Sequence, residues 1–164
     1  MDRILSVIVP AYNVEKYLRE CLDSLIIREE PDRMEVLIID DGSTDSSREI
    51  GLSYEKRFPD TFRVISKKNG GHGSALNRGI AEAEGKYIKV VDGDDWLDTE
   101  ELKKMVDFLE TADQDMIAAN YCWVDTYSRK KTVQQEAPFE GVIYGKTYTM
   151  DEIGDRTYIK MHSV

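Results

Sequence analysis

The chain has 164 residues, about the length of one domain, and 41% of them are hydrophobic, which is ordinary for a protein with a buried core. Its 22 lysines and arginines against 32 aspartates and glutamates leave a formal net charge of −10. This balance argues against non-specific nucleic-acid binding, because that binding depends on neutralising phosphates. No apolar run approaches the roughly 20 residues that a membrane span needs. The apolar run at residues 4–9 is too short for a signal peptide, so we expect a cytoplasmic protein without a transmembrane segment.

Apolar runs that favour strands alternate with amphipathic stretches that favour helices along the first two thirds of the chain. The predicted strands are residues 4–9, 34–39, 62–66 and 86–91. The predicted helices that follow them are residues 15–27, 45–57, 74–84 and 99–110. After residue 115 the pattern weakens, with strands predicted at 116–124 and 132–135 and an apolar, unfinished segment at 158–164.

This alternation predicts an α/β fold with a mostly parallel central sheet and helices on both of its faces. We expect the first strand to stop at Pro10, because proline cannot donate to a strand ladder. The fourth strand is rich in β-branched and aromatic residues of the kind that fill a buried strand. The two cysteines, Cys21 and Cys122, lie far apart in apolar settings and are predicted to be buried free thiols in a reducing compartment.

Four loops with polar side chains are predicted at the carboxyl ends of the four strands, where parallel sheets bind their ligands. They are residues 10–13, 40–45, 67–73 and 92–95. In the last of them, three carboxylates stand within four residues after a strand, and a divalent cation with oxygen ligands would offset their repulsion. The alternative is that Asp98 or Asp95 caps the helix near Thr99 while the other acids are solvated.

The first two loops each allow two interpretations. Tyr12 presents an aromatic face that can stack on a nucleobase, or it packs against the following helix. The residues from Gly42 to Asp45 suit a turn and a helix cap, which leaves Asp40 and Asp41 without a structural task. A carboxylate there can accept the imino proton of a uracil or the hydroxyls of a ribose.

The third loop combines three glycines with basic and polar residues but matches neither G-x-x-x-x-G-K-[ST] nor G-x-G-x-x-G. A P-loop or nicotinamide-binding fold is therefore disfavoured, although helix-start amides near Ser74 can face an anion. His72 is predicted to be a loop or partner-facing residue rather than a metal ligand, because no second histidine is near it in the sequence.

Four sequence blocks, in this order and spacing, resemble the family 2 glycosyltransferases with a GT-A fold. The blocks are S-V-I-V-P-A-Y-N at 6–13, V-L-I-I-D-D-G-S-T-D at 36–45, N-G-G-H-G-S-A-L-N-R-G-I at 69–80 and G-K-Y-I-K-V-V-D-G-D-D-W at 85–96. One position departs from the pattern, because many relatives have Ala-Arg-Asn where this chain has Ala75-Leu76-Asn77.

The resemblance implies a Rossmann-like GT-A fold and a single nucleotide-sugar-binding domain over residues 1–164, truncated on its acceptor side. It implies a metal site for Mn²⁺ or Mg²⁺ formed by Asp94 with Asp92. It also implies a set of nucleotide-sugar-binding residues: Pro10, Ala11, Tyr12, Asn13, Asp41, Asn69, Asp92 and Gly93. Glycine at position 93 would keep a side chain from crowding the nucleotide.

The implied reaction is transfer of a sugar, with inversion, from a nucleotide-diphosphate sugar to a saccharide or lipid-linked acceptor in cell-surface polysaccharide synthesis. The donor is expected to be a UDP-sugar, and the enzyme is expected in the cytoplasm or at the inner membrane face. A bound metal would neutralise charge on the leaving diphosphate. In such enzymes the base is an Asp of a later segment, which we expect beyond Val164.

Two other classes remain open. One is a non-catalytic nucleotide- or metal-binding module, or an inactive fragment, of the same fold. The other, more distant, is a nucleotidyltransferase, which usually carries a Gly-rich basic loop after its first strand, unlike residues 11–14.

Overall fold

A computed structural model describes residues 3–29, 31–119, 121–125, 128, 131–133, 143 and 145–153. The chain divides into two compact units, residues 1–112 and residues 113–164, which are described separately below. The expectation of a single domain over residues 1–164 stays a prediction.

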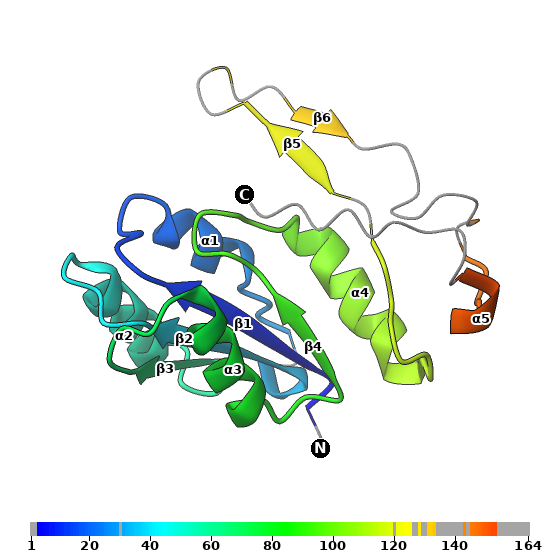
Figure 1. Cartoon of the computed structure of the whole chain (residues 1–164), viewed down its shortest axis with the longest axis horizontal. Coiled ribbons are helices and arrows are strands. Elements are labelled where there is room, and N and C mark those ends of the chain that lie inside the picture. The colour runs from blue at the N-terminus through cyan, green and yellow to red at the C-terminus, as the bar shows by residue number, and fades with distance from the viewer. Residues whose placement is uncertain are drawn as a thin grey trace. The chain divides into compact units, whose positions relative to one another are not determined.

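The first unit is built on a four-stranded sheet whose order is β3-β2-β1-β4 and whose strands are all parallel (Figure 1). The strands are β1 Leu5–Ala11, β2 Met34–Asp40, β3 Phe62–Ser66 and β4 Tyr87–Val90. The two central strands, β1 and β2, are buried along their whole length, as expected for continuous apolar runs covered on both faces. The helical elements are α1 Leu18–Ser24, η1 Pro31–Arg33, α2 Ser47–Arg57, α3 His72–Glu82 and α4 Thr99–Thr111.

Helices cover both faces of this sheet, as the alternation predicts. On one face α2 approaches closely at Gly51, where an added Cβ would lie 3.1 Å from Val64 Cγ2 and 3.4 Å from Ile38 Cγ2. On the other face Ala75 of α3 belongs to the same buried cluster as Leu37 and Ile39. Neighbouring residues of a strand point to opposite faces, so α2 and α3 lie on opposite sides of β2.

Helix α3 packs against β1 without an intervening side chain at Gly79. A Cβ added there would lie 2.4 Å from Cγ2 of Ile8, which is fully buried. Because real Cβ atoms do not come this close to another carbon, a glycine at this position sets the distance between α3 and the sheet.

The first strand does not stop at Pro10, as expected, but continues through it to Ala11. The carbonyl of Ile8 accepts a hydrogen bond of 3.0 Å from the Val91 amide, on the β4 side. Backbone groups alternate along a strand, so the missing amide hydrogen of Pro10 also falls on the β4 side. The pairing of β1 with β4 ends at Ile8 and Val90, so no ladder bond is lost there.

The expectation of a buried fourth strand is wrong, because Tyr87 and Lys89 are only half-buried on one face and the residues of the other face are exposed. Ile88 is 45% exposed and Val90 is 41% exposed. Strand β4 lies at one end of the strand order, and α3 packs on β1 and β2 instead of β4. Helix α1 is also shorter than the predicted 15–27, because residues 15–17 form a turn.

A buried carboxylate ties β4 to the sheet at the amino ends of the strands. Glu35 Oε1 accepts hydrogen bonds from Ser6 Oγ at 2.5 Å and from the Glu84 amide at 2.7 Å. The Gly85 amide donates to Ser6 Oγ at 2.8 Å. These bonds hold the turn between α3 and β4 against β1 and β2, and so fix where β4 begins.

The described part of the second unit contains a two-stranded antiparallel ribbon and a short helix. Its elements are β5 Cys122–Val124, β6 Lys131–Val133 and α5 Met150–Ile153. The strand predicted at 116–124 forms only at its end, and the segment predicted at 158–164 lies outside the described residues. Both cysteines are free, and Cys21 is buried as expected, but Cys122 is exposed, because a two-stranded ribbon does not bury both of its faces.

Within the described ranges, the helices are too short or too polar to cross a membrane.

Candidate functional site

The four predicted loops follow the carboxyl ends of the four parallel strands and therefore meet at one edge of the sheet. They comprise residues 12–17 after β1, 41–46 after β2, 67–71 after β3 and 91–98 after β4. The sheet order places the first and second loops between the third and the fourth, and hydrogen bonds between side chains and backbone join the first three loops to one another.

Asn13 ties the first loop to the second. Its backbone has a φ of 54°, the left-handed region that asparagine tolerates. Its Oδ1 accepts hydrogen bonds from the Thr44 amide at 2.8 Å and from the Asp45 amide at 3.4 Å. Asp45 of the second loop also binds the first loop, since its Oδ2 accepts a hydrogen bond from the Glu15 amide at 3.0 Å. The Oδ1 of Asn13 is thus engaged within the protein.

Asp41 ties the second loop to the third. Its side chain is buried and forms an ion pair with Lys67, and its carboxylate accepts from the Gly70 amide at 3.0 Å and from the Gly71 amide at 2.8 Å. Burial acts to raise the pKa of Asp41, but the Lys67 ammonium and the two amides outweigh it and hold that pKa below its usual range.

Asp40 serves the second loop itself, because its Oδ1 accepts a hydrogen bond of 3.0 Å from the Ser43 amide. Asp40 and Asp41 therefore both have a structural role in this loop, which the turn-and-cap interpretation had left unexplained. A nucleobase contact from Asp41, as the resemblance implies, stays a prediction.

The Asp41 network predicts acid sensitivity of the fold. A carboxyl group whose pKa is lower in the folded state stabilises the fold above its unfolded pKa of about 3.9, and this stabilisation disappears as the pH falls through the folded pKa. We expect Asp41→Asn to lower the free energy of unfolding by about 2–4 kcal/mol at pH 7, because it leaves the Lys67 ammonium without its buried partner. Urea unfolding at pH 7 and pH 3 measures this, and the difference between wild type and variant should shrink at the lower pH. An equal difference at both values would contradict the assignment.

The fourth loop begins directly at the end of β4 and turns at Gly93. The Asp95 amide donates to the Asp92 carbonyl at 2.9 Å, which closes the turn. Gly93 is buried, and an added Cβ would lie 3.0 Å from Val14 Cγ2 and 3.2 Å from the Pro10 carbonyl oxygen. Packing against the first loop therefore requires glycine here, a reason that differs from the expected clearance for a nucleotide.

Negative charge accumulates in this loop. The thiol of Cys21 lies beneath it, with Sγ donating to the Asp92 carbonyl at 3.7 Å. Burial, followed by the charges of Asp95, Asp94 and Asp92, raises the pKa of Cys21 to about 12. Burial and the charges of Asp94 and Asp92 also raise the pKa of Asp95. A cation at this position would offset a real electrostatic cost.

The alternative interpretation holds in part, because Asp98 caps α4 and Asp94 and Asp95 are exposed, whereas Asp92 is only partly exposed. Asp98 is the N-cap of α4, and its Oδ1 accepts from the Glu100 amide at 3.1 Å and from the Glu101 amide at 3.2 Å. Asp92, Asp94 and Asp95 lie before this cap and take no part in it.

Asp92 has the chemistry of a metal ligand. Its side chain is 40% exposed, yet its Oδ1 is buried and has no hydrogen-bond partner within the described structure. A buried carboxylate oxygen without a donor fits a cation. In the described residues no three side chains of His, Cys, Asp or Glu form a cluster that could hold a metal.

The residues predicted to contact the nucleotide divide into two groups. Tyr12 is 50% exposed, and Asn69 is exposed as well, so both side chains are accessible to a ligand. Pro10, Ala11 and Asp41 are buried, so they can shape the site but offer little side-chain surface to it.

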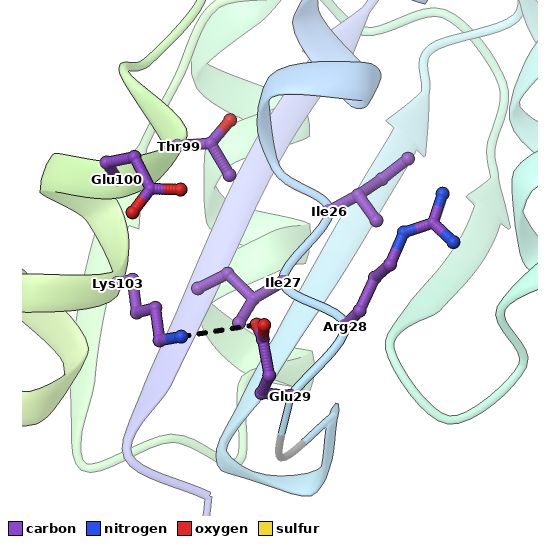
Figure 2. Close-up of a pocket in the computed structure, with 7 residues that line it drawn as sticks. All are labelled: Ile26, Ile27, Arg28, Glu29, Thr99, Glu100 and Lys103. Carbon is purple, nitrogen blue, oxygen red and sulfur yellow. Dashed lines mark ion pairs between the residues drawn. The ribbon is translucent and has the colours of Figure 1, made fainter.

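A depression of about 190 Å³ lies elsewhere in the first unit (Figure 2). Its lining residues come from the segment after α1 and from the start of α4, and Lys103 forms an ion pair of 3.4 Å with Glu29 across it. None of the predicted site residues lines it.

Two contacts at the site were not expected from the sequence, and His72, predicted in a loop, is in a helix. Lys67 pairs with Asp41, and His72, the first residue of α3, lies near Asp92. The two residues of each pair are at least 20 positions apart in the sequence. The strands β3 and β4, which precede Lys67 and Asp92, are the outer strands of the sheet. No local spacing signals such pairs, so sheet order and the position of α3 would have to be known first.

Comparison with known proteins agrees with the fold and with the motifs. The family described as Glycosyl transferase family 2 matches residues 6–162. The uncharacterized glycosyltransferase EpsJ of Bacillus subtilis is 39% identical over 121 residues, which cover 74% of this chain and 35% of that protein. The chain spans between a third and a half of the length of the curated relatives it matches first.

Two solved structures share the GT-A fold. S. aureus TarS 1–349 in complex with UDP-GlcNAc has a TM-score of 0.58 and 35% identity, over 65% of this chain and 31% of that one. The mannosyltransferase PcManGT of Pyrobaculum calidifontis, in complex with GDP-Man and Mn²⁺, has a TM-score of 0.58 and 26% identity, over 66% of this chain and 33% of that one. With its parallel sheet, its four loops and this match over nearly its whole length, the chain belongs to glycosyl transferase family 2 and has a GT-A fold.

Proposed function

We propose that this chain is the donor-binding part of a metal-dependent glycosyltransferase that uses a UDP-sugar. The observation that carries the proposal is Oδ1 of Asp92, which is buried and has no hydrogen-bond partner among the described residues, in a loop of three carboxylates at the carboxyl edge of the sheet. The exposed Tyr12 and Asn69 belong to loops at the same edge. A site that combines a cation-binding loop with an exposed aromatic ring suits a nucleoside diphosphate, which has both a charged end and a flat base.

The proposed roles follow the surroundings of each side chain. Tyr12 stacks on the base, Asn69 contacts the nucleotide, and Asp92 with Asp94 holds Mn²⁺ or Mg²⁺. Asp41 and Asn13 position the loops that carry these residues, since hydrogen bonds within the protein already engage their oxygens. Pro10, Ala11 and Gly93 form the buried floor beneath.

The relatives support the choice of donor. TarS is described in complex with UDP-GlcNAc and PcManGT with GDP-Man and Mn²⁺, so both are associated with a nucleotide sugar. UDP is proposed because TarS, at 35% identity, is the more similar of the two.

The proposed reaction is transfer of the sugar to a saccharide or lipid-linked acceptor with inversion. A bound divalent cation would stabilise negative charge on the leaving diphosphate. The side chains of Asp92 and Asp94 would hold that cation, and Tyr12 would hold the base. The acceptor, the role in cell-surface polysaccharide synthesis and the cytoplasmic or inner-membrane location stay predictions.

No residue described here is proposed as the base. Asp151 and Glu152 lie on α5 of the second unit, and Glu152 Oε2 accepts a hydrogen bond of 2.7 Å from the Thr149 amide at the start of that helix. This arrangement is that of a helix cap.

Isothermal titration calorimetry with UDP, GDP and ADP, each with Mn²⁺ and with EDTA, tests the proposal. We expect UDP to bind with Mn²⁺ at least about tenfold more tightly than GDP or ADP, a difference of about 1.4 kcal/mol, and to bind weakly in EDTA. Release of UDP from UDP-sugars in the presence of Mn²⁺ then separates a transferase from a module that only binds. Absence of nucleotide binding with any metal would sink the proposal.

A further inference from the structure

His72 faces the acidic loop from the start of α3. Its Nε2 lies 3.8 Å from Asp92 Oδ1, the buried oxygen that has no hydrogen-bond partner. The imidazole is 59% exposed, so solvent and ligands can reach it. His72 begins α3 and Asp92 lies in the loop after β4, and the two meet because α3 returns the chain from β3 across β2 and β1 to β4.

The distance between these two atoms decides what they can do together. At 3.8 Å they are too far apart for a hydrogen bond, which ends near about 3.2 Å for N–H···O pairs. Two ligands of one octahedral cation with bonds of about 2.1 Å are separated by roughly 3.0 Å when adjacent and roughly 4.2 Å when opposite. The observed separation of 3.8 Å is about 0.8 Å longer than the adjacent one, so the two side chains must approach by about that distance to share one octahedral cation.

We propose that His72 Nε2 and Asp92 Oδ1 bind the same divalent cation, which gives the donor site one nitrogen ligand besides its carboxylates. The inference rests on the proposed function, since the diphosphate of the nucleotide supplies further oxygens to this cation. Among the described residues no three such side chains form one cluster, so Asp94 would complete this site as the second carboxylate only after its side chain moves toward the cation.

A nitrogen ligand has a consequence for metal choice. Imidazole suits the later transition metals, and carboxylate, carbonyl and water oxygens suit Mg²⁺. Affinity for a mixed nitrogen and oxygen site rises from Mn²⁺ to Co²⁺ in the usual order of divalent metals. The site is therefore expected to prefer Co²⁺ and Mn²⁺ to Mg²⁺, and His72 is the residue that creates this preference.

Pulsed electron paramagnetic resonance of bound Mn²⁺ tests the assignment directly, because a coordinated imidazole nitrogen modulates the electron spin echo. The sequence contains only two histidines, His72 and His162, so the full chain without a histidine tag offers a matched control. With Mn²⁺ and UDP, the wild type and His162→Ala should both show nitrogen modulation, and His72→Ala should not. His72 is exposed, so the thermal unfolding midpoint of His72→Ala should match that of the wild type.

Calorimetry adds a second measurement. In the presence of UDP, His72→Ala should weaken Co²⁺ binding about tenfold or more and Mg²⁺ binding less than about threefold. Mn²⁺ bound together with UDP but without nitrogen modulation would overturn this inference and leave the proposed function intact. Absence of any Mn²⁺ and UDP complex in the wild type would overturn both.

Discussion

Replacing Asp94 with asparagine is expected to lower the affinity for UDP in the presence of Mn²⁺ by about 100-fold or more, because removing a direct ligand should exceed the 10–100-fold effects of outer-shell changes. Affinity in EDTA should stay nearly the same, since the base and ribose contacts are untouched. The side chain of Asp94 is exposed, so the substitution should not change the stability of the fold. The fall in affinity would then report the loss of a metal ligand alone.

Titration calorimetry with and without Mn²⁺ measures the effect, with Asp60→Asn as the control. Asp60 is also an exposed aspartate, but it lies in the turn before β3, at the amino ends of the strands. Asp60→Asn should bind like the wild type. If Asp94→Asn binds UDP and Mn²⁺ within about threefold of the wild type, Asp94 is not a ligand.

A Gly79→Ala substitution is expected to destabilise the first unit by about 2–3 kcal/mol, the usual range for overpacking a filled core. The new methyl group would lie 2.4 Å from Ile8 Cγ2, and Ile8 is fully buried on the sheet, so α3 itself would have to shift. Such a shift also moves the start of α3, where His72 lies.

Gly73→Ala is the matched control, because Gly73 lies in the same helix and an added Cβ there has no atom within 4 Å. This substitution should stabilise the fold by about 0.5–1 kcal/mol through the better helix propensity of alanine. Urea unfolding followed by circular dichroism separates the two variants. Equal midpoints for both would show that the contact at Gly79 does not limit the approach of α3 to the sheet.

The order of elements in the first unit is predictable from the sequence because each element has a strong periodic pattern and a turn signal beside it. Strands β2 and β3 and helices α2 and α4 appear within two residues of their predicted bounds. The extension of β1 through Pro10 was not predictable, because it depends on which neighbouring strand faces the missing amide. The exposure of Ile88 and Val90 depends in the same way on strand order, which periodicity does not reveal.

The site was predictable as a set of loops but not as a set of contacts. The three acids of the fourth loop are close together in the sequence, so the repulsion between their carboxylates can be predicted from it. The engagement of Asp41 with Lys67 and two loop amides could not be foreseen, because its partners lie in a different βα unit. Motif similarity predicts that Asp41 contacts the nucleobase. The structure shows in addition that Asp41 holds the third loop in place.

The residues of this edge form two groups. Asn13, Asp41 and Asp45 are anchors, because their hydrogen bonds join one loop to another. Tyr12, Asn69 and Asp94 are the proposed contact residues for the ligand. The anchors join the first three loops, and Asn13 does so although it is exposed like the contact residues. Substitutions of the contact residues are therefore expected to change which nucleotide is accepted, while the anchors keep the loops assembled. Under the proposed function, donor preference is then expected to change by substitutions that leave the fold intact.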